Sequence, residues 1–316
     1  MALVIAGCDG RQSALEPAGK AAEHVAELFW AMSVGAAIIW VGVIGLAVYS
    51  IHIAPQPHGR RAAVYIIGGG VVFPTVVLTG LLIYGLSMLP ALIAPAPEGS
   101  PVVTVIGEQW WWRVRYQAPD GEAVELANEI RMPVGQPVGF ELTSPDVIHA
   151  FWIPPLGGKM DMIPGRTTRL ALHATRTGEF RGQCAEYCGT SHALMAFPVV
   201  VMEPDAFAAW LEHQAAAAAS PTTPEAERGR ALFLAAGCGA CHAVRGTPAD
   251  GVIGPDLPHV GSRLSLGAGT LPNDADAFVK WIAETETVKP DVHMPPFGML
   301  ARDELHDLAA YLESLE

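Results

Sequence analysis

Two cysteines, a histidine and a methionine fall within twelve residues, in the segment Cys184-Ala-Glu-Tyr-Cys188-Gly-Thr-Ser-His192-Ala-Leu-Met195. Thiolate and thioether sulfurs are soft metal ligands and imidazole suits copper, so this set favours copper over calcium or magnesium. Zinc is a weaker alternative, because zinc sites rarely use methionine and usually have more closely spaced cysteines. A disulfide between the two cysteines is the other alternative, but it needs neither the histidine nor the methionine. A further ligand is offered upstream by His149.

A second motif, Cys238-Gly-Ala-Cys241-His242, has the C-x-x-C-H pattern that attaches c-type haem. Its two thiols form thioethers with the haem, and its histidine ligates the iron. A thioredoxin-like or zinc motif is the alternative, but the adjoining histidine and a downstream methionine favour haem. Methionine as the second axial ligand raises the reduction potential. The candidates are Met294 and Met299, with His293 less favoured.

The first segment resembles the C-x-E-x-C-G-x-x-H-x-x-M signature of subunit II of the haem-copper cytochrome oxidases. This resemblance implies a dinuclear copper centre, CuA, in which Cys184 and Cys188 bridge two copper ions. It makes His149 and His192 terminal ligands, Met195 a weak ligand and the Glu186 carbonyl oxygen a ligand to the other copper. The Glu186 side chain resembles the family's ligand to a magnesium ion at the boundary with subunit I.

Three further stretches of the sequence also resemble known families, and each resemblance implies a role for particular residues. Met294-Pro-Pro resembles the axial-ligand loop of class I cytochromes c, so we predict Met294 as the haem ligand. The carbonyl of Pro255, in Gly254-Pro255-Asp-Leu, is expected to fix the His242 tautomer. In Trp110-Trp111-Trp112, the family places the first aromatic residue over the copper centre, where electrons enter. We therefore predict that role for Trp110. For Trp111 and Trp112 we expect ordinary sandwich packing and a membrane-interface position, and at least one of the three tryptophans should face outward, because neighbouring side chains on a strand point to opposite faces.

Two long stretches without charged residues precede these motifs. The apolar parts, roughly 28–53 and 63–89, are long enough to cross a bilayer as helices. A buried soluble hairpin is a poor alternative for two such stretches. Arg60 and Arg61 lie between them, and the positive-inside rule places that loop in the cytoplasm. Both termini and both metal-binding regions then face the outer side of a bacterial inner membrane. Many family members carry a carboxylate for proton uptake near the start of the second helix, but Tyr65–Ile67 has none.

Beyond the second apolar stretch, residues 98–205 alternate apolar and polar side chains with a period of two, between Gly and Pro turns. Such short strands predict a β-sandwich, and the resemblance makes it cupredoxin-like, with the ligands on loops at one end. The predicted fold is therefore multidomain: two transmembrane helices, a cupredoxin-like β-sandwich and an all-α cytochrome c domain. The predicted divisions are an N-terminal segment 1–24, a helical hairpin 25–97, the copper domain 98–205, a linker 206–224 and the haem domain 225–316.

Composition agrees with a membrane protein that works outside the cytoplasm. The 316 residues are 51% hydrophobic, and the mean hydropathy is +0.30. The net charge is −13 and the acidic excess lies beyond residue 97, which disfavours nucleic acid as a partner. The acidic surface either attracts a basic protein partner or only confers solubility. Cys8 follows a lipobox-like Ile-Ala-Gly run and is a candidate for lipidation. No basic residue precedes that run and it is short for a signal peptide, so lipidation and a chance match both stay open.

Together these features predict the subunit through which electrons enter a membrane-bound terminal oxidase. A donor cytochrome c or cytochrome bc complex reduces the haem. The electrons pass to CuA and on to subunit I, where O2 is reduced to water with proton translocation. The expected partners are subunit I, the other oxidase subunits and the lipid bilayer. Two alternatives stay open: a subunit of a CuA-type nitric oxide reductase, and a membrane-tethered copper carrier. A quinol oxidase is disfavoured, because such relatives lack the copper cysteines.

Overall fold

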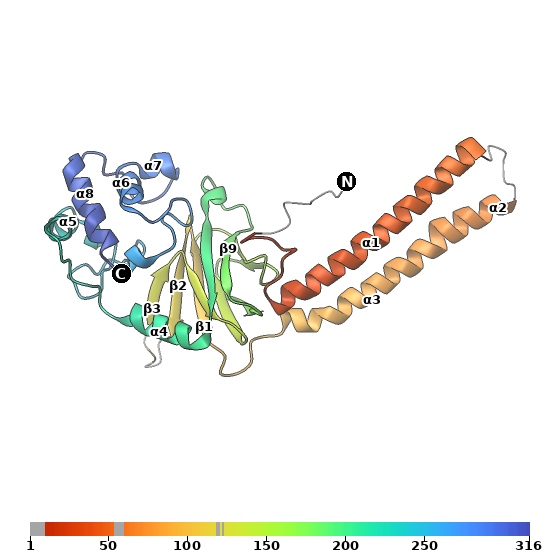
Figure 1. Cartoon of the computed structure of the whole chain (residues 1–316), viewed down its shortest axis with the longest axis horizontal. Helices are drawn as coiled ribbons and strands as arrows, with labels where there is room; N and C mark the ends of the chain where they lie inside the picture. The colour runs from red at the N-terminus through yellow and green to blue at the C-terminus, as the bar shows by residue number, and fades with distance from the viewer. Residues whose placement is uncertain (1–9, 54–59, 118–120, 122) are drawn as a thin grey trace. The chain divides into compact units, whose positions relative to one another are not determined.

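The structure is a computed structural model that describes residues 10–53, 60–117, 121 and 123–316 (Figure 1). Contacts divide the chain into two compact units. One is Glu23–Ala94, and the other joins Met1–Ala22 to Pro95–Glu316. Cys8 lies outside the described residues, so its lipidation stays a prediction.

The first unit is helical, as the two uncharged stretches predict. Helix α1 (Lys20–Val48) continues through a π-helical turn, Tyr49–Ile53. A short α2 (Arg60–Ala63) leads through a π-helical segment, Val64–Val72, into α3 (Phe73–Ile93). Figure 1 shows them as the two arms of a hairpin. Both arms are long and apolar enough to span a bilayer, and none of the 18 most apolar consecutive residues of either arm is buried. The predicted pair of apolar helices is confirmed.

The copper domain is a sandwich of two five-stranded sheets. One sheet has the order β3-β2-β1-β5-β8, and the other has the order β4-β10-β9-β6-β7. Pairs β1–β5 and β4–β10 are parallel, whereas the other neighbours run antiparallel. The ten strands are β1 (Val102–Glu108), β2 (Trp111–Gln117), β3 (Ala123–Ala127), β4 (Ile130–Pro133), β5 (Pro137–Thr143), β6 (His149–Trp152), β7 (Met160–Met162), β8 (Thr168–His173), β9 (Gly178–Cys184) and β10 (Ala196–Met202).

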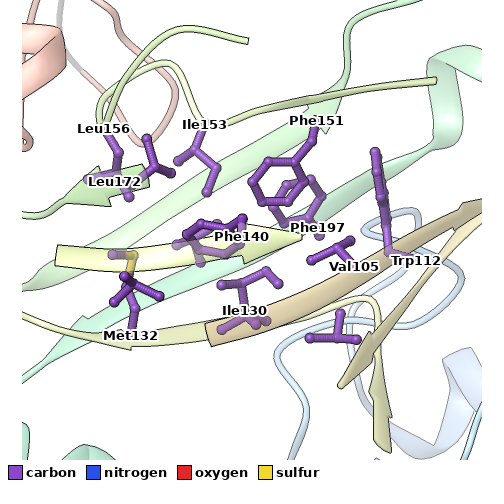
Figure 2. Packing of buried hydrophobic residues seen from close by; sticks show 14 of the residues in the cluster. Val105, Trp112, Ile130, Met132, Phe140, Phe151, Ile153, Leu156, Leu172 and Phe197 are labelled. Atoms are coloured by element: carbon purple, nitrogen blue, oxygen red, sulfur yellow. The ribbon is translucent and has the colours of Figure 1, made fainter. Parts of the chain in front are cut away.

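Aromatic side chains fill the space between the two sheets (Figure 2). Phe151 of β6 stacks on Phe197 of β10 with 5.0 Å between ring centroids, and Trp112 meets Phe197 edge-on at the same distance. A Cβ atom at Gly182 of β9 would lie only 2.1 Å from the Phe197 ring. Because interiors are close-packed, any larger residue there would displace this stack. The strand ends that carry the predicted copper ligands therefore rest on a rigid core.

Residues assigned to the linker by sequence begin with a helix that belongs to the sandwich. Helix α4 (Pro204–Ala215) buries Phe207 and Leu211 in the sandwich core, and Tyr116 of β2 meets the Trp210 ring at 5.4 Å. The helix therefore contributes to the stability of the copper domain, and the chain between α4 and the next helix is short.

The haem domain is built from four helices and the loops between them: α5 (Pro224–Ala235), α6 (Ala275–Ala283), α7 (Thr285–Val288) and α8 (Arg302–Glu313). The Thr223 hydroxyl accepts a hydrogen bond from Ala226 N and so caps α5, whose first residue is Pro224. One stripe of leucines is buried along and just beyond α8: Leu305, Leu308, Leu312 and Leu315. Phe233 of α5 and Tyr311 of α8 meet edge-on at 5.6 Å, so α5 and α8 form the main packing contact of this domain.

We expect Gly229→Ala to destabilise the haem domain, although helix propensity alone would stabilise it by about 1 kcal/mol. Gly229 lies in α5, and a Cβ atom there would lie 1.9 Å from the Asp307 carbonyl oxygen of α8. Overpacking of this kind costs roughly 1–3 kcal/mol. Thermal unfolding of the full chain should show a lower midpoint for the haem domain. The exposed Glu227 of the same helix provides the control, Glu227→Ala. Equal midpoints for both variants and the wild type would contradict the close approach.

Candidate copper and haem sites

The predicted copper ligands come from three segments that meet at one end of the sandwich. His149 is the first residue of β6 and Cys184 the last residue of β9. Cys188, His192 and Met195 lie on the connection from β9 to β10, which includes a short turn of helix, His192–Leu194. His149 therefore begins a strand, whereas the sequence placed it on a loop. A strand end held by neighbouring pairs fixes a ligand more firmly than a loop does.

All six predicted ligand positions converge. The ligand atoms of His149, Cys184 and Cys188 lie within 4.8 Å of one another. The Cys184 and Cys188 sulfurs are 3.8 Å apart, with His149 Nδ1 3.8 Å from the first and His192 Nδ1 3.5 Å from the second. Met195 Sδ is 3.8 Å from the Cys188 sulfur, and the Glu186 carbonyl oxygen is 3.2 Å from the Cys184 sulfur. Two sulfurs at the centre with imidazoles, a thioether and a carbonyl around them are a soft donor set that fits copper.

The charge of this cluster is set by hydrogen bonds between its members. The Cys184 and Cys188 sulfurs form a hydrogen-bonded pair, and this pairing lowers the pKa of Cys184 to about 3. The same pairing, together with burial, raises the pKa of Cys188. Burial alone would lower the pKa of His149, but its hydrogen bonds to Asp146 and Cys184 raise the pKa to about 9. Within the cysteine pair Cys184 is thus the more acidic thiol, and His149 holds its proton more firmly than an ordinary imidazole.

Asp146 orients His149 from behind. Its Oδ1 lies 2.9 Å from His149 Nε2, which leaves Nδ1 facing the cysteine sulfurs. Its other oxygen accepts from Gln109 N at 2.7 Å. Burial opposes the charge on Asp146, but the His149 bond and two backbone amides lower the pKa of this carboxyl to about 2. A carboxylate behind a metal-binding imidazole fixes the tautomer and raises the basicity of the ligand. The sequence analysis did not single out Asp146, although its position three residues before His149 was visible.

We expect Asp146→Asn to weaken copper binding by about 10- to 100-fold, the usual cost of losing a group that orients a metal ligand. The amide keeps the shape of the side chain but removes the negative charge. Copper retention during titration with a chelator measures the change. Glu141→Gln is the matched control, because Glu141 pairs with Arg169 on an exposed part of the same domain. Equal retention in wild type and Asp146→Asn would contradict this role.

The three consecutive tryptophans have three different environments. Trp110 is buried and donates from Nε1 to the Cys188 carbonyl at 2.9 Å, so it lies against the copper ligand loop. Gly189, at φ +115°, leaves room for this ring, since a Cβ atom there would lie 3.0 Å from Trp110 Cζ2. Trp112 packs in the core, as predicted. Trp111 is only half-buried, and the Arg113 guanidinium lies 4.7 Å above its ring. Trp111 is therefore the tryptophan that points away from the core, in line with the expectation that at least one of the three faces outward.

The haem motif opens onto a cavity of about 410 Å³. Cys238, Cys241 and His242 line this cavity, and so do Met294 and His293. His242 Nδ1 donates to the Pro255 carbonyl at 2.7 Å, as expected, which leaves Nε2 free to bind iron. Burial lowers the pKa of His242, so the imidazole is neutral, as a ligand must be. The cavity, its apolar walls and its two thiols fit a covalently bound haem.

The candidates for the second axial ligand differ in exposure. Met299 is 78% exposed and is not among the residues that line the cavity, whereas Met294 lines it and packs on the haem domain core. His293 also lines the cavity but is exposed. The Met294 carbonyl accepts from Thr285 Oγ1 at 3.1 Å, which fixes the loop. These contacts favour Met294.

Glu186, the residue predicted to bind magnesium, lies at the surface beside the copper ligands. Its carboxylate is half-exposed and lies 3.8 Å from Lys159 Nζ, while Asp161 lies 3.9 Å from the same nitrogen. Lys159 thus lies close to both carboxylates. The magnesium site stays a prediction.

Comparison with known proteins agrees with this arrangement. Residues 119–203 match the model of the "Cytochrome C oxidase subunit II, periplasmic domain" family, and residues 226–316 match that of "Cytochrome c". Cytochrome c oxidase subunit 2 of Alkalihalophilus pseudofirmus is 32% identical over 100% of this chain and 95% of its own length. The chain belongs to the cytochrome c oxidase subunit 2 family. It is thus a subunit of a haem-copper oxidase, an oxidoreductase, and it carries a cytochrome c domain.

Other members of the cytochrome c oxidase subunit 2 family match over shorter stretches. The subunit 2 of Bacillus sp. (strain PS3) is 36% identical over 69% of this chain and 63% of its own length. The crystal structure of the periplasmic domain of subunit II of the Bradyrhizobium japonicum cytochrome oxidase is 35% identical, with a TM-score of 0.35. It covers 38% of this chain and 96% of the other. The match to the subunit II periplasmic domain suggests CuA copper and the match to cytochrome c suggests haem, as do the two ligand clusters.

Proposed function

We propose that this chain is the subunit through which electrons enter a membrane-bound cytochrome c oxidase. One observation carries the proposal: the cavity lined by the haem motif is also lined by Trp110 and Asp146 of the copper domain. Trp110 donates to the Cys188 carbonyl, and Asp146 bonds His149. Two groups that touch predicted copper ligands thus form part of the wall of the haem cavity. This arrangement supports transfer between two centres in one chain.

In this proposal each centre has its own ligands. Cys184, Cys188, His149, His192, Met195 and the Glu186 carbonyl hold a dinuclear copper centre, while Cys238, Cys241, His242 and Met294 hold one haem c. When bound, the two groups supply one-electron redox chemistry. The protein excludes water, fixes the His149 and His242 tautomers through Asp146 and Pro255, and keeps the ligands rigid on strand ends and short loops.

The proposed setting is the bacterial inner membrane. The two apolar helices suit a bilayer, and Arg60 and Arg61 between them favour a cytoplasmic loop. The two metal domains then face the outside, where a donor cytochrome c or cytochrome bc complex reaches them. Subunit I is the proposed acceptor and the place where O2 is reduced to water with proton translocation. The Glu186 side chain is the proposed ligand of a magnesium ion at the boundary with subunit I.

The test is gas consumption by the detergent-solubilised complex isolated through this chain and supplied with reduced cytochrome c. Rapid, cyanide-sensitive O2 uptake is expected. Consumption of NO without O2 uptake would instead indicate a nitric oxide reductase with the same two metal sites. If no partner copurified and neither gas was consumed, the chain would be a copper carrier, and its copper should then exchange.

A further inference from the structure

One lysine is buried between the copper domain and the haem domain. Lys289, just after α7, is 1% exposed, although lysine side chains are almost never fully buried without a partner. Its three ammonium protons go to three backbone carbonyls: Trp110 O at 2.7 Å, Leu194 O at 2.8 Å and Gly267 O at 2.9 Å. An ammonium group has three donors, so its hydrogen-bonding capacity is used completely.

These three carbonyls belong to segments that are far apart in the sequence. Trp110 precedes β2 and lies against the copper ligand loop. Leu194 lies between the predicted copper ligands His192 and Met195. Gly267 is in the haem domain, on the loop before α6. One side chain thus joins the tryptophan, the copper ligand loop and the haem domain.

The loop that carries Lys289 also carries the predicted haem ligand Met294. This loop makes two further contacts with the copper domain. Pro290 O accepts from Ser191 Oγ at 2.6 Å, and Ser191 is buried next to His192. Val292 packs against the sandwich core rather than the core of its own domain. The segment 289–294 therefore links the predicted axial ligand of the haem to the predicted ligands of the copper.

A second pairing stabilises the same junction. Ala196 N donates to Ala268 O at 3.0 Å, directly after Met195. Farther away, Glu129 accepts from Leu264 N at 2.8 Å, and Arg113 donates to Val252 O at 3.0 Å. These outer contacts hold the two domains together without touching the ligand loops. Loss of the Lys289 contacts should therefore loosen the junction locally rather than release the domain.

Burial of Lys289 is energetically costly. Removal from water lowers the pKa of its ammonium to about 7. Among the described residues no carboxylate forms an ion pair with it. A hydrophobic side chain could fill this space without the cost of burying a charge. A hydrophobic side chain could not, however, bind three carbonyls at once, and this requirement explains the lysine.

We infer that Lys289 is a positioning residue that fixes the haem ligand loop on the copper ligand loop and so sets the rate of electron transfer between the two centres. The inference rests on the proposed function. In the step concerned, one electron leaves the reduced haem iron and is gained by the oxidised copper pair. No bond forms or breaks, and no proton needs to move.

The test is Lys289→Met in the full complex, which keeps the apolar stem and removes the ammonium. After rapid photoreduction of the haem, we expect electron transfer to copper to slow severalfold, because the electronic coupling between two redox centres falls steeply with the distance between them. The haem potential and the copper electron paramagnetic resonance spectrum should stay unchanged. Amide hydrogen exchange should rise in peptides that cover 189–196 and 264–270, a readout that needs no turnover.

Ser191→Ala provides a second, milder variant that removes only the bond to Pro290 O, and it should shift the same two readouts by less. Lys280→Met is the control, because Lys280 is exposed on α6, and it should match the wild type. If the wild type transfers electrons from haem to copper and Lys289→Met matches it in both rate and hydrogen exchange, the inference about Lys289 is wrong and the proposed function still holds. Absence of any haem-to-copper transfer in the wild type would instead overturn the proposed function. If Lys289→Met failed to assemble, an unchanged rate in Ser191→Ala would count against the inference.

Discussion

Replacing Cys184 with serine should abolish the copper signals of the complex and leave the haem spectrum intact. Cys184 is buried at the centre of the cluster, with contacts to His149, Cys188 and the Glu186 carbonyl. Serine is close in size, so packing of the β9 end should survive. Its hydroxyl is a hard donor of high pKa that replaces a soft thiolate, and a bridging position is therefore lost. O2 uptake with reduced cytochrome c should fall to background.

Copper content, the copper absorption bands and electron paramagnetic resonance measure the first effect, and the reduced-minus-oxidised haem spectrum measures the second. Thr190→Ala is the control, since Thr190 is exposed on the same loop and should leave all four signals unchanged. Copper signals that persist in Cys184→Ser would show that Cys184 is not a ligand. Loss of the haem spectrum together with copper would indicate a folding defect instead.

Much of the candidate site could be predicted because its residues are close together in the sequence. Cys184, Cys188, His192 and Met195 lie on one segment, and C-x-x-C-H is continuous. Spacing therefore identified both clusters before any fold was known. His149 was harder, since only the resemblance linked it to a segment thirty-five residues away, and strand pairing of β6 with β9 brings the two together.

What the sequence did not predict depends on contacts between segments. Lys289 was not singled out from the sequence, and nothing near it in the sequence names the carbonyls of Trp110, Leu194 and Gly267. Alternation of faces along a strand predicted that at least one tryptophan points outward, but not that the outward face of Trp111 forms part of a cavity wall beside the haem domain. Helix α4 lies largely within the predicted linker, whereas its few large side chains pack it on the sandwich. The local sequence pattern around a residue does not show which distant segments it contacts in the folded chain.

Replacing Met294 with alanine should change the spectrum of the oxidised haem and lower its reduction potential. A thioether ligand stabilises the ferrous state, so its loss favours the ferric state. Axial ligands and their surroundings set haem potentials over about 0.8 V, so the shift should be a sizeable part of that range. Alanine leaves the cavity open on the methionine side, and water or His293 can then reach the iron. Spectroelectrochemical titration of the complex measures the potential.

Met299→Ala is the matched control, because it removes the same side chain from a position 78% exposed and five residues away. Its haem spectrum and potential should equal those of the wild type. If Met299→Ala shifted the potential and Met294→Ala did not, the axial ligand would be Met299, and the loop would have to fold inward on haem binding. Copper signals should be unchanged in both variants, because neither residue touches the predicted copper ligands.

A lowered haem potential in Met294→Ala would also speed electron transfer to copper by raising the driving force, whereas Lys289→Met should slow that transfer at constant potential. The two variants thus separate the energetics of the haem from the geometry of the junction.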